Sequence, residues 1–148
     1  MVFEGIDTRS TVKLNGKIIL TTNNSFVQYR VILNKSDIKF DSQNLLEVEI
    51  YSTKKFDELA NGKNRMPFLY AHTRKAAYQY SWDWAPNLNT LGIWKKVYVV
   101  EFDDISIDYI WIRNRNISEH SAVLNFVTSL KSNLNDVKGK YLVKIFSD

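Results

Sequence analysis

The sequence predicts an all-β protein built from two successive β-units, and three patterns support that prediction. A two-residue turn signal, Asn15-Gly16, lies between apolar runs. Residues 46–51 alternate apolar and polar side chains, and three runs rich in β-branched and aromatic residues follow residue 104. Short strands separated by polar turns at this spacing are typical of antiparallel β-sandwiches.

The first predicted unit opens with a β-hairpin around Asn15-Gly16. Both residues tolerate positive φ, as a two-residue hairpin turn requires, and the apolar residues on either side define its two strands. These flanking residues are Val12, Leu14, Ile18 and Leu20. A third apolar-rich run covers residues 26–33, and the alternation over residues 46–51 predicts a further half-buried strand.

A break in the strand pattern follows, from residue 52 to residue 73. Residues 53–61 predict a short helix, with Ser52 or Thr53 as its cap and Gly62 just beyond its end. Strand character returns over residues 93–102, so the first unit ends on β-structure.

The second predicted unit contains three strand-like runs, at residues 105–112, 122–130 and 140–146, separated by polar turns. A sheet of only three strands leaves most of its inner face exposed. We therefore expect the sequence to be part of a longer protein at both ends, although periodicity alone also permits an intact small sandwich.

The composition argues against several classes of function. The net charge is +4, but the basic residues are scattered in pairs, so we expect no nucleic-acid partner. No apolar run reaches the roughly 18 residues of a membrane span. Cysteine is absent and the two histidines, His72 and His120, lie far apart, so we expect neither a metal site nor a cofactor. Glycosylation sequons at Asn23, Asn34 and Asn116 permit a secretory location.

One segment, residues 74–86, concentrates the chemistry. If it is extended, Trp82 and Trp84 point to one face and Asp83 to the other. Aromatic rings pack against the C–H faces of sugars and carboxylates accept hydrogen bonds from sugar hydroxyls, so this segment is a candidate pyranose-binding edge. A carboxylate among indoles needs a partner, and Arg74 or Lys75 is the candidate within the segment.

A structural interpretation of the same residues remains open. Paired tryptophans on a strand are often sandwich core, and Asp83 between them could simply bind an arginine or a backbone N–H. Other acidic pairs are interpreted as solvated charges with no catalytic role. They are Glu47 and Glu49, Asp57 and Glu58, and Asp103 and Asp104.

Two separate stretches, in the right order, resemble β-mannosidases of glycoside hydrolase family 2. Near the start stands Phe3-Glu4-Gly5-Ile6-Asp7-Thr8, followed by Leu14-Asn15-Gly16 and Tyr29-Arg30. The family signature is matched by Arg74-Lys75, Tyr78 and Ser81-Trp82-Asp83-Trp84-Ala85-Pro86, and then by Gly92-Ile93-Trp94. Ala85 departs from the pattern, because the family usually has glycine there, which matters if the position needs positive φ.

The resemblance implies a domain organisation. Residues 1–103 would form a jelly-roll-like, galactose-binding-type β-sandwich whose N-terminal strands are missing. Residues 104–148 would begin an immunoglobulin-like β-sandwich. The catalytic (β/α)8 barrel and its two glutamates would lie outside this chain, so no catalytic residue is expected in it.

The resemblance also implies a function, the exo-acting, retaining hydrolysis of terminal β-D-mannose from β-mannoside oligosaccharides. Asp83 would hydrogen-bond the non-reducing sugar, and Trp82 and Trp84 would shape the pocket wall. A eukaryotic member would be lysosomal or secretory. Two alternatives stay open: a free-standing carbohydrate-binding module without hydrolase activity, and a family member with another sugar specificity.

Overall fold

The computed structural model describes residues 1–64 and 68–146. Strands predominate, accompanied in the described ranges by one α-helix and three short 3-10 helices, so the all-β prediction is confirmed. The chain divides into two compact units, Met1–Val100 and Glu101–Asp148. None of the helices described is long and apolar enough to cross a membrane.

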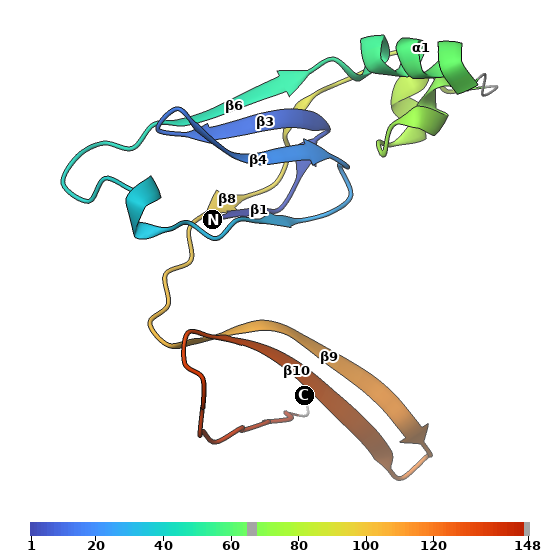
Figure 1. The fold of residues 1–148 in the computed structure, drawn as a ribbon. Coiled ribbons are helices and arrows are strands. Elements are labelled where there is room, and N and C mark those ends of the chain that lie inside the picture. Colours follow the sequence, from blue (N-terminus) through green and yellow to red (C-terminus); the bar gives the residue numbers. More distant parts are fainter. Residues whose placement is uncertain (65–67, 147–148) are drawn as a thin grey trace. The chain divides into compact units, whose positions relative to one another are not determined.

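The first fourteen residues form the spine of unit 1 (Figure 1). They contain β1 (Val2–Phe3), β2 (Ile6–Asp7) and β3 (Arg9–Leu14). Each of these strands pairs antiparallel with later strands. β1 pairs with β5 (Tyr29–Arg30) and β8 (Val97–Tyr98), and β2 pairs with β7 (Gly92–Ile93). β3 pairs with β4 (Lys17–Asn23) and β6 (Leu46–Tyr51). The small core lies on this spine, where Phe3, Ile6 and Val12 are fully buried.

The predicted hairpin is confirmed. Asn15 and Gly16 have φ values of 52° and 82°, so both central residues of the turn are left-handed, the conformation that a two-residue hairpin loop favours. The flanking strands β3 and β4 close with Leu14 opposite Lys17. β6 pairs with the other edge of β3, which confirms the strand predicted over residues 46–51.

Two predicted strands are much shorter than the apolar runs indicated. In residues 26–33 only Tyr29–Arg30 is a strand, and Phe26 and Ile32 are largely exposed outside any ladder. The run at residues 93–102 yields only β7 and β8. A strand needs a backbone partner, and the partner here, the chain from β1 to β2, is itself interrupted at Gly5.

The predicted helix is confirmed as α1 (Thr53–Asn64), which follows directly on β6 (Figure 1). It continues past residue 61 and includes Gly62, which an exposed helix interior tolerates at a cost of about 1 kcal/mol. Its Phe56 ring lies 3.3 Å from the guanidinium carbon of Arg9, a cation–π contact that ties α1 to β3. The short 3-10 helices are η1 (Lys35–Asp37), η2 (Leu69–His72) and η3 (Ala77–Tyr80).

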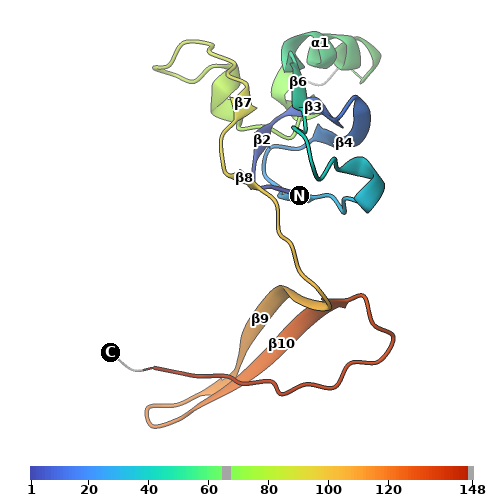
Figure 2. The same cartoon turned by 90° about the vertical axis from the view of Figure 1, so that its left-hand side faces the viewer.

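Unit 2 is a long β-hairpin of β9 (Ile105–Ile117) and β10 (Ala122–Ser132), visible in Figure 2. Both strands run beyond the predicted limits, because the ladder carries β9 to Ile117 beside the turn and β10 to Ser132 at the opposite end. The third predicted strand, at residues 140–146, is wrong: this segment has no ladder partner among the described residues, and Ile145 and Phe146 are largely exposed.

Candidate functional site

The segment around Trp82 is a tight turn and not an extended strand, so the condition under which Trp82 and Trp84 would share one face is not met. η3 ends at Tyr80, and an isolated antiparallel bridge then joins Trp82 to Ala85 through an N–H···O bond of 3.1 Å. Local hydrogen bonds of this kind satisfy the backbone without a neighbouring strand. The turn therefore projects its side chains from a loop.

Backbone strain in this turn falls on Ser81, not on Ala85. Ser81 has a φ of 112°, whereas Ala85 has no positive φ. Glycine adopts that region without steric cost and serine does not. The departure at Ala85 from the family's glycine is therefore compatible with the observed backbone.

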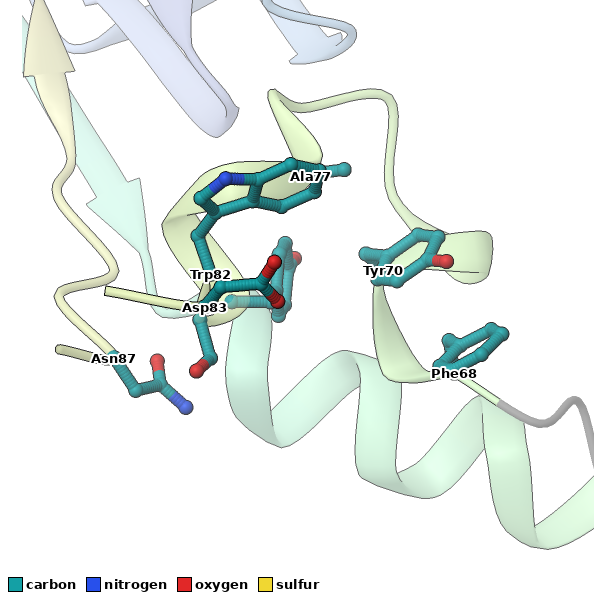
Figure 3. Close-up of a pocket in the computed structure, with 8 residues that line it drawn as sticks. Phe68, Tyr70, Ala77, Trp82, Asp83 and Asn87 are labelled. Carbon is teal, nitrogen blue, oxygen red and sulfur yellow. The ribbon is translucent and has the colours of Figure 1, made fainter. Parts of the chain in front are cut away.

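A hollow of about 580 Å³ opens beside the turn (Figure 3). It is lined by Phe68, Tyr70, Ala77, Tyr80, Ser81, Trp82, Asp83 and Asn87. Two walls face one another across it: one carries Tyr70, which stacks on Phe68 with ring centroids 5.1 Å apart, and the other carries Trp82 and Asp83. Aromatic surface with a few polar groups is the usual make-up of a small-molecule site.

Only two of the three predicted substrate-binding residues line this hollow. Trp82 and Asp83 line it, while Trp84 is not among the lining residues and packs edge-on against Trp82, with ring centroids 6.2 Å apart. Trp82 is 52% and Trp84 83% exposed, which argues against a core role within this chain. Within the described ranges, no hydrogen bond or ion pair engages the exposed Asp83 carboxylate.

Lys75 binds Asp7 and not Asp83, so its predicted role as the partner of Asp83 is wrong. Its ammonium lies 2.5 Å from Asp7 Oδ2, and it also donates to the carbonyl oxygen of Thr90. The side chain of Lys75 is fully buried, and a buried charge must be paired. Asp7 also accepts a hydrogen bond from Gln79 Nε2 at 3.4 Å, so this carboxylate faces the segment.

Arg74 acts through its backbone. Its carbonyl oxygen accepts hydrogen bonds from the N–H and the hydroxyl of Ser25, at 2.9 and 3.0 Å. Together with the Lys75–Asp7 pair, this contact fixes the start of the loop that carries the site to β2 and to the residues just after β4. The two basic residues support the loop and lie outside the lining of the hollow.

Asp57, predicted to be solvated, is fully buried behind the hollow. It accepts hydrogen bonds from the Tyr80 hydroxyl, at 2.5 Å, and from the Thr73 hydroxyl. These charge-assisted hydrogen bonds compensate for the loss of water. Burial, together with the hydrogen bond to the Asp57 carboxylate, raises the pKa of Tyr80 above its ordinary value.

The sequence interpretation missed Phe68, Tyr70, Tyr80 and Asn87 as lining residues. A usable signal existed, since aromatic residues gather in the loop after the helix without any strand alternation to account for them. Asn87, which follows Pro86 in the turn, carried no such signal. No group of three or more metal-ligating side chains occurs in the part of the chain that the structure describes.

Comparison with known proteins identifies the family. Residues 1–95 match the glycosyl hydrolase 2 galactose-binding domain-like family, which covers most of unit 1. The chain belongs to this family. The resemblance to glycoside hydrolase family 2 is thereby confirmed, as is the galactose-binding-type β-sandwich class for this galactose-binding-like domain.

Relatives of this galactose-binding-like chain include fungal and bacterial enzymes. Beta-mannosidase B of Aspergillus niger is 33% identical over 156 residues, covering 97% of this chain and 18% of that protein. Beta-mannosidase B of Emericella nidulans is 34% identical over 130 residues, covering 82% of this chain and 15% of that protein. The crystal structure of β-D-mannosidase from Dictyoglomus thermophilum is 32% identical with a TM-score of 0.76, covering 88% of this chain and 16% of that chain.

The galactose-binding-like chain thus spans between 15% and 18% of the length of these relatives. The residues that the structure describes contain no (β/α)8 barrel. Nothing in these comparisons supports the lysosomal location that the resemblance implied.

Proposed function

We propose that this chain supplies the non-catalytic sugar-binding domain of an exo-acting, retaining β-mannosidase. The observation that carries the proposal is the hollow in which the Asp83 carboxylate, unengaged by other described residues, stands beside the exposed Trp82 ring. A hydroxyl-rich ligand can donate hydrogen bonds to Asp83 while its C–H face packs on the aromatic walls. The names of the β-mannosidase relatives support β-D-mannose as the sugar that we propose here.

In this proposal the chemistry and the positioning are divided between parts of the parent protein. Retaining hydrolysis uses two carboxyl groups about 5 Å apart, one as nucleophile and one as acid/base, and these glutamates belong to a barrel outside this chain. Asp83 accepts hydrogen bonds from hydroxyls of the non-reducing sugar, and Trp82 forms the wall beside it. The contribution of this chain is orientation of the substrate and not proton transfer.

The proposed domain organisation follows the same reasoning. Residues 1–103 form the sugar-binding β-sandwich, and residues 104–148 begin an immunoglobulin-like β-sandwich. The long β9–β10 hairpin supports the second assignment, because apolar residues such as Tyr109, Ile110 and Trp111 are each at least half exposed and need further strands to cover them.

The experiment is a kinetic comparison in the full-length protein that carries this chain. Asp83→Ala should lower kcat/KM for 4-nitrophenyl β-D-mannoside by about tenfold or more, because one charge-assisted hydrogen bond to the substrate is lost. Asp41→Ala, at another exposed aspartate, is the matched control and should behave as wild type. Wild-type kinetics for Asp83→Ala, or unfolding of that variant, would defeat the site assignment.

A second candidate is a free-standing carbohydrate-binding module, and the solvent exposure of Trp82 and Asp83 within this chain alone favours it. Such a module would bind mannosides without a barrel. Thermal unfolding of the 148-residue chain with and without methyl β-D-mannoside separates the two. A saturable, Asp83-dependent rise in Tm supports the module, and the absence of any rise supports the enzyme domain.

A further inference from the structure

Behind the hollow, a buried hydrogen-bond network centres on Asp57 of α1. Asp57 is fully buried and Thr53, four residues earlier on the same helix face, is 3% exposed. Neither residue lines the hollow. A fully buried carboxylate is unfavourable unless its oxygens are occupied, so its partners reveal what it holds.

One oxygen of Asp57 holds the Trp82 wall. The ring of Tyr80 lines the hollow. Its hydroxyl donates a hydrogen bond to Asp57 Oδ2 at 2.5 Å and lies 3.2 Å from Thr53 Oγ1. Tyr80 immediately precedes Ser81, so this bond fixes the start of the turn that carries Trp82 and Asp83.

The far side of the same turn is tied to the same helix. Thr53 Oγ1 donates to Asn89 Oδ1 at 3.3 Å, and Asn89 lies a few residues beyond Trp84. The turn is therefore held to the first turns of α1 both before and after its two tryptophans.

The other oxygen of Asp57 holds the Tyr70 wall. Thr73, which follows η2 directly, donates its hydroxyl to Asp57 Oδ1. A second bond supports this attachment, because His72 Nε2 lies 3.2 Å from Asn61 Oδ1 of α1. The two aromatic walls meet at the back of the hollow, where the Tyr70 and Tyr80 ring centroids are 6.4 Å apart.

We propose that Asp57 is a positioning residue that sets the spacing of the two walls of the sugar site, through Tyr80 on one side and Thr73 on the other. This inference rests on the proposed function. Asp57 does not touch the sugar, and its effect on binding passes through the walls that it holds. Each Asp57 oxygen accepts a hydrogen bond from a hydroxyl of a different wall, so the Asp57 side chain has few other conformations that keep both bonds.

The test is a double-mutant cycle in the full-length protein, with 4-nitrophenyl β-D-mannoside as substrate. Asp57→Asn keeps the size of the side chain and removes its charge, and Tyr80→Phe removes only the hydroxyl. Each should raise KM by about fivefold with kcat little changed, since a misplaced wall weakens uniform binding. The double variant should be no worse than the poorer single variant, because both changes break the same link.

Glu58→Gln, at the exposed neighbour on the same helix, is the matched control and should keep wild-type KM. A purely structural role for Asp57 predicts less active protein, and therefore a lower apparent kcat at unchanged KM. That outcome, or multiplicative effects in the double variant, would overturn the inference. If Asp57→Asn does not fold, Tyr80→Phe decides alone, and a wild-type KM for that variant overturns the inference.

Asp83→Ala in the same series separates this inference from the proposed function. Impaired kinetics for Asp83→Ala with wild-type kinetics for Asp57→Asn and Tyr80→Phe would overturn only the positioning role. Wild-type kinetics for Asp83→Ala would remove the sugar site itself, and the positioning role with it.

Discussion

Two buried charged groups organise the loop that carries the candidate site. Lys75 attaches the loop to β2 through Asp7, and Asp57 attaches it to α1 through Tyr80 and Thr73. In both cases a charge lies out of water and forms hydrogen bonds with two partners. The exposed Asp83 contrasts with both, since it lines the hollow without a described partner.

Lys75→Met should strongly destabilise unit 1. The substitution keeps an unbranched side chain but leaves the Asp7 carboxylate buried without its counter-charge, which costs about 3–5 kcal/mol in the free energy of unfolding. Urea denaturation followed by circular dichroism measures the loss. Lys63→Met, at an exposed lysine of α1, is the control. Equal stabilities for the two variants would mean that the Lys75–Asp7 pair contributes no net stabilisation.

Tyr80 should give the fold a specific alkaline sensitivity. Its pKa is raised above the ordinary value of 10.0 by burial and by the hydrogen bond to Asp57. The neutral phenol is therefore favoured in the folded state, so the stabilisation is fully present below pH 10 and is lost as the pH rises through the folded pKa.

Tyr80→Phe should remove that part of the pH dependence, at the cost of lower stability near neutral pH. Denaturation midpoints measured from pH 7 to above pH 10 provide the comparison, with Tyr78→Phe at an exposed tyrosine as control. A pH profile of Tyr80→Phe parallel to that of wild type would contradict the role of this hydroxyl.

At the residue scale the sequence predicted Trp82 and Asp83 as candidates but not their surroundings. An aromatic residue next to a carboxylate can be recognised in the sequence. The burial of Asp57 cannot, because it depends on hydroxyls that lie 16 and 23 residues further along the chain. The carboxylate that pairs with Lys75 lies 68 residues away in the sequence, so the segment alone could not show that Lys75 is unavailable to Asp83.

At the scale of the elements, the two stretches that resemble the family pair with each other as antiparallel strands. Residues 2–7 run antiparallel to residues 92–98, with Ile6 opposite Ile93 and Phe3 opposite Val97. The backbone N–H of Trp94 donates to the carbonyl oxygen of Gly5 at 3.2 Å, and its indole ring covers Gly5. The site-bearing loop therefore leaves from and returns to the same spine.

Gly5→Ala should destabilise this pairing. A Cβ at this position would lie 2.6 Å from Trp94 Nε1 and 2.8 Å from Cε2, so the indole must shift. Overpacking of this kind costs about 1–3 kcal/mol in the free energy of unfolding. Thermal or urea unfolding measures it, and the exposed Gly139→Ala, where a Cβ meets nothing within 4 Å, should be near neutral. A neutral Gly5→Ala would contradict the close packing of Trp94.

Elements defined by local signals were predicted well. The hairpin at Asn15-Gly16 and the strand at residues 46–51 follow from turn chemistry and from alternation. Elements that depend on a distant partner were not: residues 140–146 have strand composition but no ladder among the described residues. The Trp82 segment is not extended because a backbone hydrogen bond from Ala85 to Trp82 closes it into a turn.

At the scale of the whole molecule, the proposed function separates sugar positioning from hydrolysis. The chain belongs to the glycosyl hydrolase 2 galactose-binding domain-like family and spans between 15% and 18% of the β-mannosidases to which it is similar. Its own residues provide a wall, a carboxylate and a buried frame behind them. Under the proposed function, residues outside this chain carry out hydrolysis, and Asp83 and Trp82 position the sugar.

The most direct test is a crystal structure of the full-length protein with a bound β-mannoside. The account predicts an Asp83 carboxylate oxygen within about 2.5–3.2 Å of a hydroxyl of the non-reducing sugar, the range of a hydrogen bond, with Trp82 packed beside the same sugar. A mannoside held in a catalytic barrel without contact to Asp83 or Trp82 would contradict the account.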